Sequence, residues 1–187
     1  MSVTSVSYTV QGWGVGEVWL DGATLVWHDV PRPRRGTRVR ARATPTQGGV
    51  NNPPPSGSRL AARPARRGDA LRPEAERFLH RLRAYFGGER TCFDDVVLEV
   101  DGWTPFQLDV LRALRRVPYG EVVSYGDLAR LAGHPRAQRA AGTFCAGNRF
   151  GIVVPCHRVV AADGLGSYGS LGLEYKSRLL ALEGVAL

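Results

Sequence analysis

At 187 residues, of which 43% are hydrophobic, the chain has room for one large domain or two small ones around a buried core. No apolar stretch of 18 residues occurs, so we expect no membrane-spanning helix, and residues 1–5 lack the charged and apolar regions of a signal peptide. Three cysteines without a CxxC pair favour a reducing cytoplasm over a secreted fold held by disulfides.

The net charge of +8 is concentrated in one segment. Residues 31–72 hold eleven arginines and one acidic residue, a balance of +10, so the rest of the chain sums to −2. The segment is rich in Pro, Gly and Ser without an apolar period, which predicts a long loop or linker. Two interpretations stay open: a solvated insertion without a role, or a basic arm that adds non-specific affinity for DNA. Residues 103–187 carry ten basic and six acidic residues, which also favours a phosphate-bearing partner.

Short strands and one helix are predicted in the first half of the chain. Apolar runs at 14–20 and 23–27 flank Asp21-Gly22, a strong signal for a two-residue hairpin. A helix begins at Pro73 and ends at about Phe86, before two glycines. A further strand is predicted at 96–100. These elements predict a small α/β N-terminal domain, a sheet plus a helix, over residues 1–102.

Helical patterning dominates residues 103–187. Thr104 caps a helix predicted over 105–116, Ser124 caps another over 125–132, and two more follow at 136–146 and 174–182. The two middle helices, joined by residues 133–135, have helix-turn-helix proportions. The second is rich in small residues, which suits either close packing in the core or an approach to a narrow DNA groove. We therefore expect a mostly α C-terminal domain with a helix-turn-helix, winged-helix-like element that binds DNA.

A cysteine with a histidine beside it lies between two β-branched apolar runs, in Pro155-Cys156-His157. Proline cannot donate to a sheet ladder, so we expect Cys156 at a turn or a strand end. A thiol attacks as the thiolate, and imidazole is the side chain best able to take its proton near neutral pH. Since a free thiol has a pKa of about 8.5, activation must bring it nearer neutral. Adjacent Cys and His are common, so the pair alone is a weak signal of a nucleophile.

Six segments around this pair carry a resemblance to a known family, in its order and nearly at its spacing. They are Thr104-Pro105-Phe106-Gln107, Pro118-Tyr119-Gly120-Glu121-Val122-Val123-Ser124-Tyr125, Arg139-Ala140-Ala141-Gly142, Gly147-Asn148, Pro155-Cys156-His157-Arg158-Val159-Val160 and Leu180-Ala181-Leu182-Glu183-Gly184. With them the chain resembles the O6-alkylguanine-DNA alkyltransferases, also called methylated-DNA–protein-cysteine methyltransferases. The resemblance is close over residues 103–187 and loose over 1–102.

The resemblance implies DNA repair by direct, stoichiometric transfer of an alkyl group, such as methyl, from O6-alkylguanine to Cys156, with O4-alkylthymine left open as a second substrate. The thioether product has no good leaving group, so the protein acts once and is consumed. His157 is implied to take the thiol proton through water, Glu183 to orient this histidine, and Asn148 to brace the turn before the active-site strand. We expect no cofactor and no metal, because no nucleotide fingerprint, phosphate loop or zinc-like ligand spacing occurs.

The resemblance also assigns residues to the flipped base and to DNA. Tyr125 matches the tyrosine that helps rotate the nucleotide and hydrogen-bonds the guanine, and Arg139 matches the arginine that fills the stack where the base leaves. The guanine pocket corresponds to Val159, Tyr168 and Gly169. Further DNA contacts are expected from Ser124, Ala137, Ala140 and Gly142. The implied partner is double-stranded DNA, bound in the minor groove by a monomeric cytoplasmic protein that has no membrane partner.

Some positions differ from the family pattern. Arg149 and Gly151 stand where prolines are common, and Ala146 replaces a small, polar or basic residue, which bears on the range of alkyl groups and on DNA affinity. Without the resemblance, Glu183 would be taken as a surface carboxylate at a helix end and Arg139 as a surface arginine. Three other functions stay open: a lesion-binding relative that transfers nothing, a Cys-His hydrolase, and a helix-turn-helix regulator with a structural Cys156.

Overall fold

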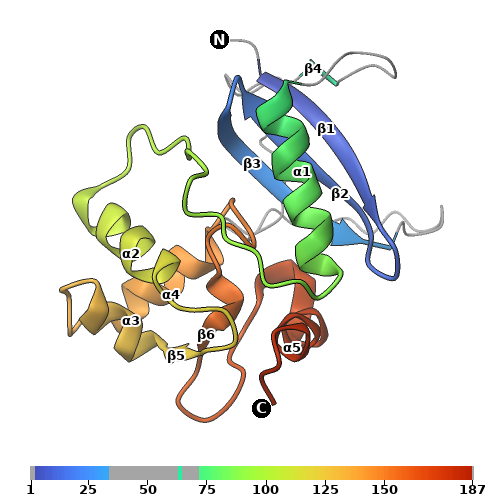
Figure 1. Ribbon diagram of the computed structural model, residues 1–187. Coiled ribbons are helices and arrows are strands. Elements are labelled where there is room, and N and C mark those ends of the chain that lie inside the picture. The colour runs from blue at the N-terminus through green and yellow to red at the C-terminus, as the bar shows by residue number, and fades with distance from the viewer. Residues whose placement is uncertain (1–2, 34–62, 65–71, 187) are drawn as a thin grey trace, which may run out of the picture.

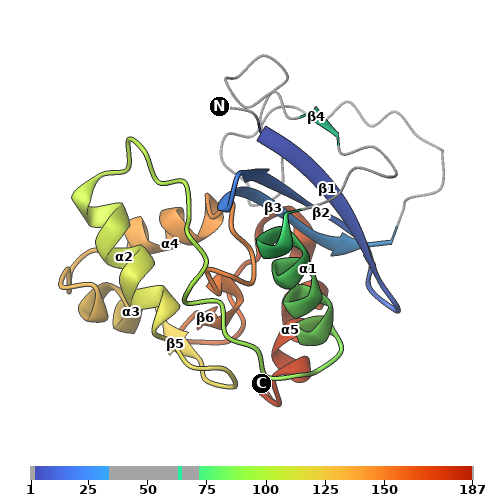
Figure 2. The same ribbon diagram turned by 45° about the horizontal axis from the view of Figure 1, so that its top comes forward.

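The computed structural model describes residues 3–33, 63–64 and 72–186 (Figures 1 and 2). Strands β1 (Val3–Val10), β2 (Gly14–Asp21), β3 (Thr24–Arg32) and β4 (Arg63–Pro64) form one sheet in the order β3-β2-β1-β4. β4 is parallel to β1, and the other pairs are antiparallel. Most of the predicted loop at 31–72 lies outside the described residues. The described parts of this segment differ from the predicted loop, because Pro31 and Arg32 extend β3 and residues 63–64 form β4.

The predicted hairpin and the first helix are confirmed. Asp21 pairs with Thr24 across the turn, and Gly22 adopts a positive φ of 63°, which a side chain would oppose. Helix α1 (Pro73–Phe86) begins with proline, whose missing N–H is no loss in a first turn, and it lies across one face of the sheet in both views (Figures 1 and 2). Its buried Phe78, Leu79 and Leu82 form the core with the sheet.

The second half of the chain is mostly helical, as predicted. It contains α2 (Pro105–Arg115), α3 (Tyr125–Leu131), α4 (Gln138–Ala146) and α5 (Gly172–Leu182), with the short strands β5 (Val123–Ser124) and β6 (Val159–Val160) and two 3-10 turns, η1 (Cys156–Arg158) and η2 (Gly169–Leu171). α2, α3 and α4 group together, while α5 lies near the C-terminal end of α1 (Figure 1). Thr104 and Ser124 cap α2 and α3 with complete capping boxes, which satisfy the free N–H groups of each first turn.

Two local predictions need correction. α4 begins at Gln138 and not at residue 136, because the capping residue Ala137 has a non-helical backbone, so Arg139 is the second residue of the helix. The strand predicted at 96–100 is a single bridge, in which Leu98 pairs with Leu25 of β3. Regular pairing does not continue there because the next part of β3 pairs with another segment, through His28 and Phe150.

The edge of β3 therefore forms backbone hydrogen bonds with two segments of the C-terminal half. The N–H of Leu25 donates to the Val97 carbonyl at 2.8 Å, and the N–H of His28 donates to the Arg149 carbonyl at 2.9 Å. The His28 ring is also buried, with Nδ1 2.6 Å from the Gly151 carbonyl and Nε2 2.6 Å from the Tyr8 hydroxyl. Since a carbonyl only accepts, Nδ1 carries the proton and Nε2 accepts from Tyr8. The sheet thus fastens the segment that leads to Cys156.

His28 should make the stability of the protein depend on pH. Burial lowers its pKa to about 4, and its hydrogen bond to Gly151 offsets only part of this. Between pH 6.5 and about 4 the unfolded chain therefore binds a proton that the folded protein does not, so this contribution is present above pH 6.5 and is lost on acidification. We expect a loss of about 3 kcal/mol in the free energy of unfolding over this range. Urea unfolding at several pH values would measure it.

The control for this prediction is His28→Gln, which keeps hydrogen-bonding capacity but cannot titrate. The difference in unfolding free energy between wild type and His28→Gln should shrink as the pH falls, since other groups titrate in both proteins. A difference that stays constant from neutral pH to pH 4 would contradict the role of His28.

No helix among residues 3–33, 63–64 and 72–186 combines the length and the apolar character needed to cross a lipid bilayer.

Candidate active site

Cys156 opens the 3-10 turn η1 directly after Pro155, so the prediction of a turn is confirmed. The residue is 3% exposed. Four residues earlier, Ile152 has a left-handed backbone with a φ of 71°, a conformation that costs a β-branched residue on the order of 1–3 kcal/mol. The strand after η1, β6, pairs in parallel with β5, which ends in the cap of α3. This pairing sets the thiol beside the start of α3.

Asn148 braces this turn with both ends of its amide. Its Nδ2 donates to the Val154 carbonyl at 2.8 Å and to Cys156 Sγ at 3.1 Å, while its Oδ1 accepts from the N–H of Phe150 at 3.0 Å. Asn148 is 1% exposed, so all three contacts are shielded from water. The amide therefore ties the end of α4 to the nucleophile and stabilises negative charge on the sulfur.

Cys156 lies at a small pocket together with most residues that the sequence assigned to the flipped base. The lining comes from α3, α4, η1 and the loop before α5: Tyr125, Gly142, Cys145, Ala146, Cys156, Ser167, Tyr168 and Gly169. Buried Tyr168 lines the pocket together with the thiol, and half-buried Tyr125 lines it together with Ser167. Buried Val159 lies three residues beyond the thiol, in β6. The pocket has a volume of about 10 Å³, room for one water molecule and not for a base.

His157 and Glu183 form a buried pair at the other side of η1. His157 Nε2 lies 2.8 Å from Glu183 Oε1, and both side chains have 0% exposure. Since an ionised carboxylate only accepts, Nε2 carries the proton and Nδ1 is left with a lone pair. Nδ1 is buried and has no hydrogen-bond partner among the described residues. An unsatisfied acceptor of this kind beside a cysteine is the arrangement that a base requires.

Glu183 accepts hydrogen bonds from several further donors. Arg158 donates from Nε and Nη2, each at 2.9 Å, the Tyr85 hydroxyl donates at 2.6 Å, and the N–H of Gly120 donates at 3.2 Å. Glu183 is the C-cap residue of α5, and its side chain is fully buried. The expectation of a surface carboxylate, which the sequence alone would favour, is wrong because α1 and the 117–120 turn cover this helix end.

Burial and charge set the protonation states of the site. Burial raises the pKa of the Cys156 thiol, and hydrogen bonds from Asn148 and Tyr168 and the charge of Lys176 offset this only in part. Burial lowers the pKa of His157 more than Glu183 raises it. For Glu183, burial alone would raise the pKa, but the hydrogen bonds and charges of His157 and Arg158 outweigh it and hold the pKa well below its usual range. At neutral pH the resting site is therefore a thiol, a neutral imidazole and a carboxylate.

The sequence predicts that activation brings the pKa of this thiol nearer neutral, whereas burial raises the pKa in the folded protein. The sequence shows the histidine beside the thiol but not the depth of burial, which favours the uncharged thiol. Deprotonation must therefore accompany the reaction.

The residues assigned to DNA lie on α3 and α4. Arg139 and Ala140 are exposed on α4, whereas Ala141 is fully buried. Gly142 faces the ring of Tyr125, because a Cβ added to this glycine would lie 3.7 Å from the ring. Ala137 is the partly exposed N-cap of α4. One face of this helix is thus packed in the core, and the other is open to solvent. The Ser124 hydroxyl is occupied by Asp127, 2.6 Å away in the capping box.

Three residues of the site were not predicted. Tyr85 reaches Glu183 and His157 from α1, Arg158 neutralises Glu183, and Lys176 lies buried beside the pocket. Arg158 stood in a quoted motif, so it carried a signal, but Tyr85 looked like one more apolar residue on the buried face of α1. Nothing in the spacing of Lys176 on α5 distinguishes it from a solvated lysine.

Two of the positions that differ from the family pattern have structural partners. Arg149 forms an ion pair with Glu99 and lies over the rings of Trp103 and Phe150, at 5.8 and 5.1 Å from their centres. Gly151 leaves no room for a side chain, because a Cβ there would lie 2.9 Å from Val30. A proline at position 151 would therefore meet the sheet.

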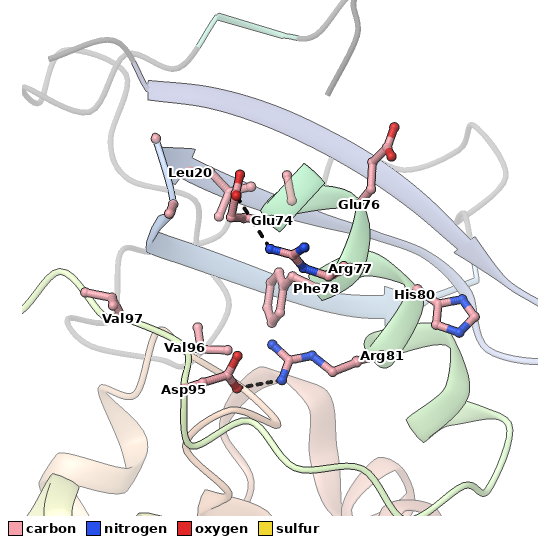
Figure 3. Close-up of a pocket in the computed structure, with 13 residues that line it drawn as sticks. Leu20, Glu74, Glu76, Arg77, Phe78, His80, Arg81, Asp95, Val96 and Val97 are labelled. Carbon is pink, nitrogen blue, oxygen red and sulfur yellow. Dashed lines mark hydrogen bonds and ion pairs between the residues drawn. The ribbon is translucent and has the colours of Figure 1, made fainter. Parts of the chain in front are cut away.

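A larger hollow lies away from the thiol, between α1, the β2–β3 turn and residues 95–97 (Figure 3). Its floor is apolar, with Phe78 and Val96, and two ion pairs cross its rim, Arg77 with Glu74 at 3.5 Å and Arg81 with Asp95 at 2.5 Å (Figure 3). Both arginines of this rim are paired with carboxylates, and none of the residues assigned to the reaction lines it. We therefore place the chemistry at Cys156.

Comparison with known proteins identifies the family. Residues 105–185 match the family model described as 6-O-methylguanine DNA methyltransferase, DNA binding domain. A methylated-DNA–protein-cysteine methyltransferase of Methanosarcina acetivorans is 49% identical over 104 residues, which cover 55% of this chain and 65% of that relative. The aligned part therefore spans less than two thirds of that protein. One of Methanopyrus kandleri is 48% identical over 119 residues, which cover 60% of this chain and 87% of the relative.

Similarity in structure extends over both halves of the chain. The crystal structure of Mycobacterium tuberculosis OGT in complex with DNA superposes with a TM-score of 0.69 at 31% identity, covering 98% of this chain and 93% of that one. Together, the matched family model, the well-covered Methanopyrus relative and this structure show that the chain belongs to the O6-methylguanine-DNA methyltransferase family.

Proposed function

We propose that this protein repairs DNA by transferring the alkyl group of O6-alkylguanine, such as methyl, to Cys156 in a single turnover. The observation that carries the proposal is the buried series Cys156, His157 and Glu183. In it, the carboxylate holds one imidazole nitrogen, and the other has no hydrogen-bond partner in the part of the chain that the structure describes. The names of the relatives, methylated-DNA–protein-cysteine methyltransferase, support the same reaction.

The proton moves first. Glu183 holds the proton of His157 on Nε2, so Nδ1 is the acceptor that takes the proton of Cys156 through one bridging water. Five hydrogen bonds to Glu183 keep it ionised, so it orients the histidine and stabilises the imidazolium without taking the proton itself.

The thiolate then displaces guanine. The Sγ–C bond forms as the C–O6 bond breaks, the electron pair of that bond stays on the base, and the proton lost by Cys156 returns the base to neutral guanine. Tyr125 is suited to hydrogen-bond the departing anion, because burial raises its pKa and it keeps its proton. The thioether left on Cys156 offers no leaving group, so one molecule repairs one base.

α3 and α4 are the proposed DNA-binding element, a helix-turn-helix with α4 in the minor groove. On the open face of α4, the short side chains of Ala140 and Thr143 allow a close approach to the groove, and Arg139 adds a positive charge. The related DNA complex of the Mycobacterium tuberculosis protein supports DNA as the partner. Because the pocket is too small for guanine, we infer that the loop at 161–169 moves outward as the base flips in. Further proposals are the domain boundary near residue 102, a monomeric state and a cytoplasmic location.

The function is tested by mixing the protein with duplex DNA that contains O6-methylguanine. Intact-mass spectrometry should show one added methyl group per protein molecule, and the DNA should contain guanine at the damaged position. Binding without any mass change would instead support a lesion-binding protein, and repeated turnover would support a hydrolase.

Arg139 is proposed to occupy the space that the flipped base leaves. Its side chain is exposed and makes no hydrogen bond or ion pair within the described residues, so Arg139→Ala should change the free energy of unfolding by less than about 0.5 kcal/mol. Transfer from duplex DNA should slow by one to two orders of magnitude, roughly the few kcal/mol of an unstacking step. Transfer from the same base in single-stranded DNA should change little. Single-turnover kinetics on both substrates measure this.

The matched control is Arg112→Ala, which removes an exposed arginine from α2, away from the pocket. Equal rates on duplex DNA for wild type and Arg139→Ala would show that this arginine does not hold the base out of the stack.

A further inference from the structure

A further hollow lies between the loop after α1, the end of α2 and the residues just before Cys156, and we call it the arginine pocket. It has a volume of about 620 Å³ and is lined by five arginines and one acidic residue, namely Arg90, Arg112, Arg115, Arg116, Arg158 and Asp94. Neither Cys156 nor any residue of α3 or α4 lines it. The arginine pocket is therefore separate from the nucleophile and from the proposed DNA-binding helices.

Two of these arginines already have a counter-charge within the protein. Arg158 lies 2.9 Å from Glu183, and Arg112 lies 3.2 Å from Asp109. These ion pairs neutralise their own guanidinium groups, so the net charge of the pocket depends on the other three arginines.

The other three, Arg90, Arg115 and Arg116, form no ion pair with a carboxylate in the part of the chain that the structure describes. Arg90 and Arg116 are exposed. Half-buried Arg115 is held by backbone dipoles, because its Nη2 donates to the carbonyls of Phe93 and Asp94 at 2.7 and 2.8 Å. Against the one carboxylate of Asp94, three guanidinium groups leave a balance of +2. The pocket therefore attracts anions.

The end of a helix explains only part of this arrangement. Basic side chains in the last turn favour the negative end of the helix dipole, which accounts for Arg112 and Arg115 on α2. Arg90 belongs to the loop after α1 and adds a further positive charge to the same pocket. Because like charges that converge repel one another, this arrangement gains stability when an anion binds between them.

Thr91 gives a second, independent indication of a ligand. The residue lines the arginine pocket, and its Oγ1 is shielded from solvent and has no hydrogen-bond partner among the described residues. Buried hydroxyl groups in folded proteins nearly always have a partner. A phosphate oxygen in the pocket would accept a hydrogen bond from this hydroxyl.

The size and the apolar side of the pocket indicate what else the anion carries. Val117, Ile152 and Val153, each 3% exposed, contribute to the lining together with Pro155. Pockets of roughly 300–1,000 Å³ hold whole organic ligands, so this volume exceeds the need of a phosphate alone. An apolar wall suits a planar base better than a sugar. A terminal phosphate monoester carries a charge of about −1.5 to −2 at neutral pH, which matches the balance of the arginines.

We propose that the arginine pocket binds a nucleoside monophosphate, either free or as the phosphorylated 5′ end of a DNA strand. The phosphate lies against Arg90, Arg115 and Arg116, and the nucleoside lies against the apolar wall. This site does not rest on the proposed function, because none of its contacts involves Cys156 or the base that would be repaired.

Binding is tested by isothermal titration calorimetry of the full chain with deoxyadenosine monophosphate, and with deoxyadenosine as the ligand that lacks the phosphate. The monophosphate should bind and the nucleoside should not. Arg90→Gln and Arg116→Gln should each weaken binding about tenfold, because each removes a charge-assisted hydrogen bond. Arg83→Gln is the matched control, since it removes an exposed arginine of α1 outside the pocket and should bind as wild type does.

Thr91→Val separates a ligand contact from a structural role. Valine keeps the shape of threonine, and the hydroxyl has no partner to lose in the described part of the free protein. The variant should therefore bind the monophosphate more weakly without any fall in the free energy of unfolding. Weakened folding with unchanged binding would instead make Thr91 a structural residue and remove it from the site.

Cys92 reports where the ligand binds, since it is exposed and lines the arginine pocket, whereas Cys145 and Cys156 are buried. Bound monophosphate should slow the reaction of Cys92 with N-ethylmaleimide, read by mass spectrometry of its peptide. Stronger protection by a 5′-phosphorylated single strand than by the same strand with a 5′-hydroxyl would identify a DNA end as the source. Protection by the monophosphate but by neither strand would identify the free nucleotide. Absence of protection by the monophosphate and by the phosphorylated strand at millimolar concentration, or equal binding in Arg90→Gln, Arg116→Gln and wild type, would overturn the proposal.

Discussion

Replacing Cys156 by alanine should abolish methyl transfer while leaving DNA binding measurable. The thiol is the only group in its pocket that combines a neighbouring base with a donor on the sulfur, since Asn148 contacts it and His157 adjoins it. The α4 residues proposed to contact DNA are exposed on the open side of that helix, so their geometry should survive the loss of one sulfur atom. Peptide mapping after incubation with O6-methylguanine DNA measures the acceptor, and a gel-shift titration measures binding.

The controls for this prediction are the two other cysteines. Cys145 lines the same pocket but has no histidine beside it in the sequence. Cys92 is exposed and does not line the pocket. Cys145→Ala and Cys92→Ala should both still accept one methyl group at Cys156. Methyl label on Cys145 or Cys92 in the wild-type protein would show that the nucleophile has been assigned to the wrong cysteine.

Replacing Glu183 by alanine should both destabilise the protein and slow the reaction. The change would leave the guanidinium of Arg158 buried without its counter-charge and free the hydroxyl of Tyr85. Breaking one side of a buried ion pair costs about 3–5 kcal/mol, so the free energy of unfolding should fall by that amount. His157 would also lose the partner that holds its proton on Nε2, and transfer should slow by about 10²–10⁴-fold. Urea unfolding and single-turnover transfer measure the two effects.

Glu183→Gln separates the two effects, because it keeps an oxygen that can accept from His157 but removes the charge. It should retain the fold better than Glu183→Ala and still transfer slowly. Glu174→Gln, on the exposed first turn of α5, is the matched control and should behave as wild type. Unchanged stability and rate in Glu183→Gln would mean that Glu183 is only a helix-end carboxylate.

Much of the local structure followed from short-range chemistry. Thr104 and Ser124 satisfy the first N–H groups of their own helices, Gly22 permits a turn that other residues resist, and Pro73 begins α1, so each predicted element formed nearly where its signals stood. These signals join residues at most four positions apart, so they can be predicted from the sequence alone. The start of α4 was misplaced by two residues because Ala137 offers no side-chain cap to mark it.

The sequence by itself determined the nucleophile motif, the order of the helices and, through its resemblance, the family. The tertiary structure decided what those residues can do. Tyr85 and Glu183 are 98 residues apart, and Lys176 reaches carbonyls up to 17 residues away, so no periodicity or spacing could bring them to Cys156. Burial raises the pKa of the thiol and leaves one nitrogen of His157 without a partner among the described residues. It exists only once the sheet edge, α1 and α5 have packed around η1. Desolvation is a property of the folded interior, and for that reason the chemistry of this site could be named from the chain but its protonation states could not.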